Sequence, residues 1–163
     1  MPDKITISNT SPLLYLHLVQ QLDLLPRLYR EVFVPAAVEA ELEAGAERGV
    51  DVPKIAALPW LRVMPLASDA SIPLVTDLGR GEAQAIALGL ENPNSRLILD
   101  DTLARRIARL RKLQFTGTVG VIVKAKQAGL LPAVSPVISA LREAGLWLSD
   151  LLVDQVLRQA GEE

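Results

Sequence analysis

Two adjacent aspartates, Asp100 and Asp101, stand where a short apolar run gives way to a helical pattern. The run over residues 97–99 is typical of a strand that is buried on both faces. We expect Asp101 to cap the helix that follows. Chemistry in α/β folds tends to lie at such strand-to-helix switches, and two like charges side by side are costly unless a cation or a base lies between them. The pair is therefore a candidate reactive site.

Two glutamates also stand where charge has a possible role in chemistry. Glu41 follows Val38 by three residues, at or beside the inward face of a predicted helix, and Glu82 lies at a helix N-terminus four residues before Ile86. Strand ends and helix starts meet at one edge of the sheet in a doubly wound fold, so these carboxylates can converge with the aspartate pair. Each also has a structural alternative: a boundary residue for Glu41, a favourable helix-dipole contact for Glu82 and a helix cap for Asp101.

Several carboxylates in one cleft repel one another unless a hard cation joins them. Ligation by oxygen alone favours Mg²⁺ or Mn²⁺. Such an ion holds a phosphodiester, lowers the pKa of a bound water and stabilises the leaving oxygen. The acidic residues therefore favour metal-dependent phosphodiester chemistry.

Polar side chains also follow the first predicted strand, at Ser8, Asn9, Thr10 and Ser11. In the usual doubly wound order this strand neighbours the one that leads into Asp100, so their oxygens can hold metal-bound waters. Turn and cap chemistry is the alternative interpretation.

The helix after the aspartate pair is basic. Arg105 and Arg109 share one of its faces, one turn apart. A basic helix directly after an acidic cleft can hold the phosphates that flank a scissile one. A solvated face with ion pairs is the alternative.

Composition narrows the class of protein. The chain has 163 residues, half of them hydrophobic, which predicts one domain over residues 1–163. Its net charge of −2 provides no global basic field, and the absence of cysteine excludes disulfides, thiol catalysis and zinc–thiolate sites. The sequence shows no signal-peptide pattern and no apolar run near the roughly 18 residues that a membrane span needs. We therefore expect a cytoplasmic protein with no membrane partner.

Strands alternate with helices along the chain, which predicts a parallel sheet covered on both faces. Strands are predicted over residues 5–8, 31–34, 61–65, 97–99 and 113–116, the third at an edge of the sheet because prolines bracket it. Main helices are predicted to begin at Ser11, at Gly81 and at Leu103, where Leu103, Ile107 and Leu110 form an apolar stripe. Another is predicted over residues 35–43, with its end near Gly45. The last three are a helix that reaches Ala128 and helices over residues 136–144 and 150–160.

Taken together, the motifs resemble those of PIN-domain proteins, close to the VapC-type toxin nucleases of prokaryotic toxin–antitoxin pairs. The matching segments appear in family order: ISNTSPL at 7–13, VPAAVEAEL at 34–42, GEAQAI at 81–86, LILDD at 97–101 and GTVG at 117–120. The resemblance implies a three-layer α/β/α fold with a central parallel sheet of four or five strands. It also implies cleavage of single-stranded RNA that depends on Mg²⁺ or Mn²⁺.

Position by position, the resemblance assigns the site residues of the family to this sequence. The four acidic positions of the family fall on Asn9, Glu41, Glu82 and Asp101, with Asp100 beside the last. The hydroxyl after the first acid falls on Thr10 or Ser11. The chain departs from the family at Asn9, where an aspartate is usual. An amide oxygen still coordinates a hard cation, but more weakly, because one negative charge is missing.

Two hypotheses follow from these residues. The first is a metal-dependent endoribonuclease, the toxin of a pair whose small antitoxin is encoded beside it, with Arg105, Arg109, Thr10 and Ser11 in contact with RNA. The second is a catalytically impaired PIN-like domain that acts as a binding or assembly module. A receiver-type phosphoacceptor is set aside, because its acidic pair follows the first strand.

The last predicted helices carry more apolar surface than a terminal element needs. The residues concerned are Leu146, Trp147, Leu148, Leu151, Leu152 and Val156. Core packing accounts for part of this surface. A homodimer face accounts for the rest, and the family resemblance also favours a dimer.

Overall fold

A parallel sheet of five strands forms the centre of the computed structural model, which describes residues 4–162. The strand order is β3-β2-β1-β4-β5, and every neighbouring pair is parallel. The strands are β1 (Ile5–Ser8), β2 (Val32–Val34), β3 (Leu61–Val63), β4 (Ser95–Ile98) and β5 (Gln114–Thr116). The parallel sheet and its edge strand at 61–63 agree with the sequence prediction, although β4 begins two residues earlier than predicted.

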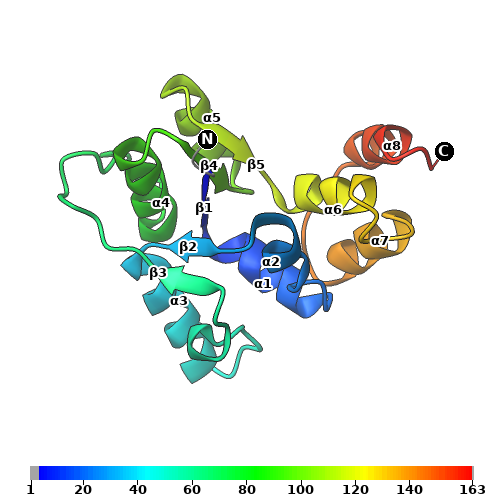
Figure 1. The fold of residues 1–163 in the computed structure, drawn as a ribbon, viewed down its shortest axis with the longest axis horizontal. Coiled ribbons are helices and arrows are strands. Elements are labelled where there is room, and N and C mark those ends of the chain that lie inside the picture. Colours follow the sequence, from blue (N-terminus) through cyan, green and yellow to red (C-terminus); the bar gives the residue numbers. More distant parts are fainter. Residues whose placement is uncertain (1–3, 163) are drawn as a thin grey trace.

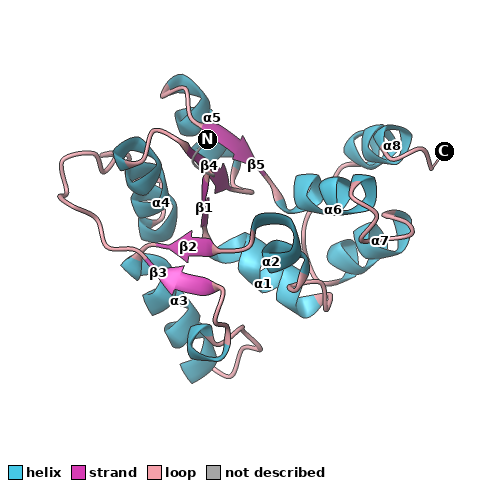
Figure 2. Ribbon diagram, in the orientation of Figure 1, coloured by secondary structure: helices cyan, strands magenta, loops and turns pink. Residues whose placement is uncertain are grey.

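Helices lie on both sides of this sheet (Figures 1 and 2). They are α1 (Thr10–Leu18), α2 (Leu24–Tyr29), α3 (Ala36–Glu47), the 3₁₀ turn η1 (Ile55–Ala57), α4 (Arg80–Glu91), α5 (Thr102–Leu110), α6 (Thr118–Gln127), α7 (Ser135–Glu143) and α8 (Asp150–Gln159). In Figure 1, α4 and α5 lie on one side of the strands, α1, α2 and α6 lie on the other, and α7 and α8 lie beyond α6. This is the expected three-layer α/β/α architecture.

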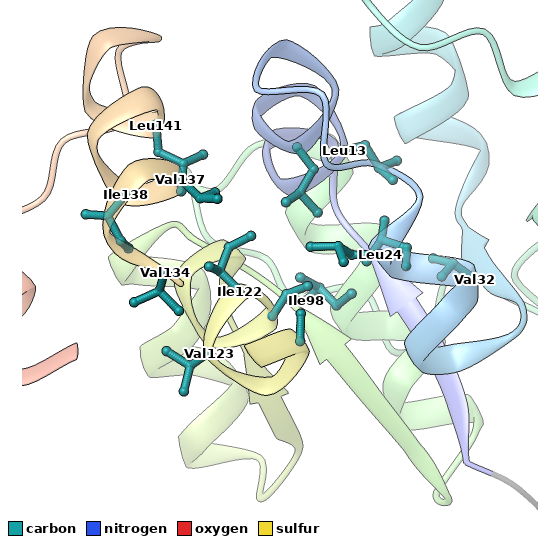
Figure 3. Close-up of a cluster of buried hydrophobic side chains, with 14 of the residues drawn as sticks. Leu13, Leu24, Val32, Ile98, Ile122, Val123, Val134, Val137, Ile138 and Leu141 are labelled. Atoms are coloured by element: carbon teal, nitrogen blue, oxygen red, sulfur yellow. The ribbon is translucent and has the colours of Figure 1, made fainter. Parts of the chain in front are cut away.

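Successive side chains of each strand point to opposite faces of the sheet, so the hydrophobic core is divided into two clusters, one on each face. Leu97 and Leu99 pack with α4 and α5, whereas Ile98 packs with α1, α2 and α6. Figure 3 shows the second cluster, in which Ile122 lies between Leu13 and Leu141, with Ile98 beside it. Because strand side chains alternate between faces, an unbroken apolar run is what a strand covered on both sides requires.

Two sequence predictions about helices are wrong. Helix α3 passes through Gly45, because the residue that adopts the left-handed conformation is Gly49, with φ of 82°. The amide of Gly49 donates to the Ala46 carbonyl and that of Val50 to the Gly45 carbonyl, which completes a Schellman end. In α5, Leu110 is 74% exposed, and Ala104 and Ala108 are the fully buried residues. Small side chains face the core there, so Leu110 turns to solvent.

Among the described residues, no helix combines the length and the apolar character needed to cross a membrane.

Candidate active site

The carboxyl ends of β1 and β4 lie side by side at one edge of the sheet. Ser8 pairs with Ile98, and the backbone N–H of Asn9 donates to the Ile98 carbonyl at 3.2 Å. The residues that follow these two strands, Asn9 in one case and Asp100 and Asp101 in the other, therefore emerge at the same edge.

Asn9 is the most buried of the predicted site residues, with only 2% of its surface exposed. It occupies the N-cap position of α1, but its side chain does not cap that helix. The Asn9 side chain interacts with the Glu82 carboxylate, whose pKa it lowers. Within residues 4–162, its Oδ1 is buried and has no hydrogen-bond partner. Leaving a buried acceptor unsatisfied is costly, so this oxygen is a candidate ligand atom.

Glu41 points to the same place from α3. Thr10 donates from Oγ1 to Glu41 Oε2 at 2.9 Å. A Cβ atom added to Gly81 would lie 2.3 Å from Glu41 Oε1 and 2.9 Å from Asn9 Oδ1. These two acceptor oxygens therefore converge on the backbone of Gly81 in the first turn of α4, where a side chain would displace the Glu41 carboxylate.

Glu82 brings a further carboxylate into this region. Its Oε2 would lie 2.2 Å from a Cβ atom at Gly79, so the side chain is folded against the start of its own helix. Burial raises the pKa of the Glu82 carboxyl above its ordinary value, and the negative charges of Asp101 and Glu41 raise it further. The pKa is lowered in turn by the Glu82 backbone N–H and the Asn9 amide. Glu82 therefore interacts electrostatically with three of the predicted site residues.

Asp101 forms the predicted helix cap. Its Oδ2 accepts a hydrogen bond from the Ala104 amide at 2.9 Å, at the N-terminus of α5. The side chain is exposed, and its charge reaches Glu82. One carboxylate oxygen thus orients the group, and the other is available to a ligand. We call Asn9, Glu41, Glu82 and Asp101 the acidic centre.

Asp100 is engaged elsewhere. Its Oδ1 accepts from the Thr118 amide at 2.7 Å, and its Oδ2 accepts from Thr118 Oγ1 at 2.6 Å. Both oxygens therefore hold the N-terminus of α6 against the end of β4. A Cβ atom added to Gly117 would lie 2.9 Å from Asp100 Oδ1, so the neighbouring glycine allows this close approach.

The donor set of the acidic centre fits a hard divalent cation, because it consists of carboxylate and amide oxygens and includes the orphaned Asn9 Oδ1. In the part of the chain that the structure describes, no three acidic or histidine side chains are grouped closely enough to share a metal ion. The Glu82 carboxylate, folded toward Gly79, would have to turn outward to join the others.

The predicted RNA contacts lie around this edge. Arg105 and Arg109 extend over the ring of Phe115, with guanidinium carbons 5.2 and 5.4 Å from its centroid. Arg105 also reaches toward Gly117, where a Cβ atom would lie 3.5 Å from its Nη1. Ser11 is partly exposed in the first turn of α1.

Sequence reasoning missed the parts played by Gly79, Gly81 and Thr118. Both glycines precede Glu82 in the loop-to-helix transition, and small residues at that point were a readable signal of close approach. Thr118 follows the fifth strand at the same edge as Asp100. The order of the strands was needed to see that the two side chains meet.

The sequence model of the DUF3368 family, described as a PIN domain, matches residues 5–162. A search of curated proteins finds no match to the chain. The family match spans every strand and helix described above.

Proposed function

Because the chain belongs to the PIN-domain family, whose fold is nuclease-like, we propose that it is a ribonuclease that requires a divalent metal ion. PIN domains generally use such ions, and Mg²⁺ or Mn²⁺ suits the oxygen ligands of this chain. The proposed metal ligands are the acidic centre: Asn9, Glu41, Glu82 and Asp101. The match supports one PIN-like domain that extends over residues 1–163.

One observation carries this proposal. Asn9 Oδ1 is buried without a partner, and Glu41 Oε1 converges with it on Gly81. A buried amide oxygen without a donor and a carboxylate oxygen that approaches the same backbone position repel each other, so a cation between them is the simplest source of compensation. The raised pKa of Glu82, caused first by burial and then by neighbouring carboxylates, supports the same conclusion.

When bound, a divalent ion supplies positive charge to the phosphodiester and lowers the pKa of an attacking water. The Glu82 carboxylate would help to hold this ion, which would offset the repulsion from the neighbouring carboxylates that contributes to its raised pKa in the metal-free protein. Thr10 holds Glu41 in position through its hydroxyl. Asp100 acts through Thr118 and positions α6 beside the centre, in place of the direct catalytic and metal-binding roles predicted from the sequence.

Single-stranded RNA is the proposed substrate. Arg105 and Arg109 are held on Phe115 along α5, the helix that Asp101 caps, where they would attract flanking phosphates. Thr10 and Ser11 supply hydroxyls in the first turn of α1, directly after Asn9. Contacts of this kind position a strand without reading its sequence.

The biological setting in the proposal is a cytoplasmic toxin that a small antitoxin neutralises, as the VapC-type resemblance implies. We also propose a homodimer. Its support is the exposed apolar surface near the C-terminus, where Trp147 is 83% and Leu151 is 69% exposed.

A catalytically impaired module is the second candidate. The neutral Asn9 at the first acidic position and the folded-back Glu82 carboxylate favour it. Both features reduce the negative charge that is available to a metal ion.

Incubation of the purified protein with single-stranded RNA and Mn²⁺ separates the two candidates. We expect the wild type to cleave and Glu82→Gln to lose activity. If the wild type is inactive and Asn9→Asp cleaves, the impaired module is the correct conclusion. If Glu82→Gln cleaves as well as the wild type, the assignment of the acidic centre is wrong.

A further inference from the structure

A second like-charge cluster, of opposite sign, lies at the beginning of β4. Tyr29, Arg96 and Lys124 line a pocket of about 180 Å³ together with residues 114–116. Arg96 is the second residue of β4, whereas the acidic centre lies beyond the end of that strand. We call this site the basic pocket. It is separate from the proposed catalytic site and does not depend on the proposed function.

Two cations meet over one aromatic ring in this pocket. The Arg96 guanidinium carbon lies 5.0 Å from the centroid of Tyr29, and Lys124 Nζ lies 4.7 Å from the same centroid. Lys4 lies nearby and donates to Gln114 Oε1. Burial lowers the pKa of the Lys124 ammonium, and the positive charges of Arg96 and Lys4 lower it further. The cations of the pocket therefore repel one another.

No negative group of the described chain compensates this charge. Within residues 4–162, neither Arg96 nor Lys124 forms an ion pair with a carboxylate, and the buried Arg96 Nε has no hydrogen-bond partner. The Tyr29 phenol does not supply the charge either, because burial raises its pKa and keeps it neutral. A ring face attracts a cation only modestly, so it does not replace a counter-ion.

We propose that the basic pocket binds a phosphate group. The Arg96 guanidinium and the exposed Lys124 ammonium both line the pocket and are charged donors of the kind that phosphate oxygens accept, and a dianion between them removes their repulsion. The volume is smaller than that of pockets for drug-sized molecules, which fits a small anion. The phosphate can be free in solution or can end a nucleotide chain.

The first experiment uses inorganic phosphate as the probe. It is titrated into the protein by calorimetry, with EDTA present to remove divalent ions and with ionic strength held constant by chloride. We expect wild-type protein to bind phosphate in the millimolar range. Lys124→Gln and Arg96→Gln should each weaken binding by about tenfold or more, since each removes one charge-assisted hydrogen bond.

Lys54→Gln is the matched control, because it removes one exposed positive charge outside the pocket. It should bind phosphate as the wild type does. The proposal is overturned if wild-type protein does not bind phosphate in this range, or if Lys54→Gln weakens binding as much as Lys124→Gln.

Thermal unfolding distinguishes a binding role from a purely structural one. In phosphate-free buffer, Lys124→Gln should leave the unfolding temperature unchanged or raise it, because repulsion is relieved. Phosphate should raise the unfolding temperature of the wild type and not that of the variant. A lower unfolding temperature for Lys124→Gln, with no phosphate effect on either protein, contradicts the proposal. If Arg96→Gln does not fold, Lys124→Gln decides the question, since its side chain is exposed.

Binding of a DNA tetranucleotide, measured with and without a 5′-phosphate, shows whether the bound phosphate belongs to a nucleotide chain. DNA is used so that the proposed ribonuclease activity does not cleave the probe. Tighter binding of the phosphorylated form than of free phosphate supports a chain end, and binding of free phosphate alone supports a small anion. Binding of free phosphate or of the phosphorylated oligonucleotide that Lys124→Gln does not weaken overturns the proposal.

Discussion

Glu82 in the acidic centre and Glu162 near the C-terminus have opposite electrostatic surroundings. Glu162 accepts from Lys126 Nζ and the Val134 amide, each at 2.7 Å, and from the Ser135 amide at 3.1 Å. The hydrogen bond from Lys126 and those from the two amides hold the pKa of the Glu162 carboxyl below its ordinary value. The pKa of Glu82 is raised by burial and by other carboxylates.

The comparison separates charge that stabilises the fold from charge that awaits a ligand. Glu162 joins α6, the beginning of α7 and the residues after α8, and its carboxylate accepts hydrogen bonds from Lys126, Val134 and Ser135. Glu82 has the carboxylates of Glu41 and Asp101 for neighbours. We therefore expect substitution of Glu162 to change the stability of the fold and substitutions in the acidic centre to change activity.

The largest expected effect is the loss of RNA cleavage in the Glu41→Gln variant. Loss of a ligand charge should reduce the cleavage rate by about 100-fold or more, because mutation of a residue that only supports a metal ligand already lowers metal affinity or activity by about 10–100-fold. Initial rates with Mn²⁺ and single-stranded RNA measure it. Glu43→Gln, two residues further along α3 and also exposed, is the control and should cleave normally. Equal losses in the two variants would mean that Glu41 has no special role.

A smaller effect, in the opposite direction, is expected for Asn9→Asp. A carboxylate in place of the amide adds one negative ligand, so Mn²⁺ affinity should rise by about tenfold. Calorimetric titration with Mn²⁺ measures the change. Unchanged affinity would show that position 9 does not contact the ion.

Glu162→Gln should lower the unfolding temperature by a few degrees and leave RNA cleavage unchanged. Because the folded pKa of Glu162 is lowered, its contribution is present above the ordinary value of 4.5 and is lost as the pH falls through the folded pKa. Unfolding temperatures of the two proteins between about pH 3 and 7 should therefore converge at the acidic end. A constant difference across this range would contradict the assignment.

The smallest effect is expected for the stability of metal-free Glu82→Gln. The folded protein binds the Glu82 proton more tightly than the unfolded chain does, because the folded pKa is raised. The free energy of unfolding therefore falls as the pH rises from 4.5 through the raised pKa, and the variant does not show this loss. Near neutral pH the variant should unfold at a slightly higher temperature than the wild type, even though it is inactive. A lower temperature would indicate that Glu82 is a structural residue.

The sequence predicted the parts of this molecule that depend on local pattern. The apolar run 97–99 indicated a strand covered on both faces, and the position of Asp101 indicated a helix cap, which the Ala104 amide confirms. Leu110 was predicted wrongly because spacing alone does not tell whether a leucine or the alanines of the same helix face the core.

Side-chain direction was beyond the reach of the sequence. Asp100 and Asp101 are adjacent and chemically identical, yet Asp100 turns to Thr118 and Asp101 caps α5. Their difference depends on β5 and α6, which come later in the chain. The convergence of Asn9 and Glu41 on Gly81 likewise depends on the packing of α3 against α4.

The central position of β1 has a consequence for the order of events during synthesis. Ile5 pairs with Ser95, and the last carboxylate of the acidic centre, Asp101, follows that partner strand. A nascent chain therefore exposes Asn9 and Glu41 long before β4 leaves the ribosome, and the two sides of the centre meet only when most of the domain has been made. For a protein proposed to cut RNA, this arrangement delays activity until β4 and Asp101 have been made and can pair with β1.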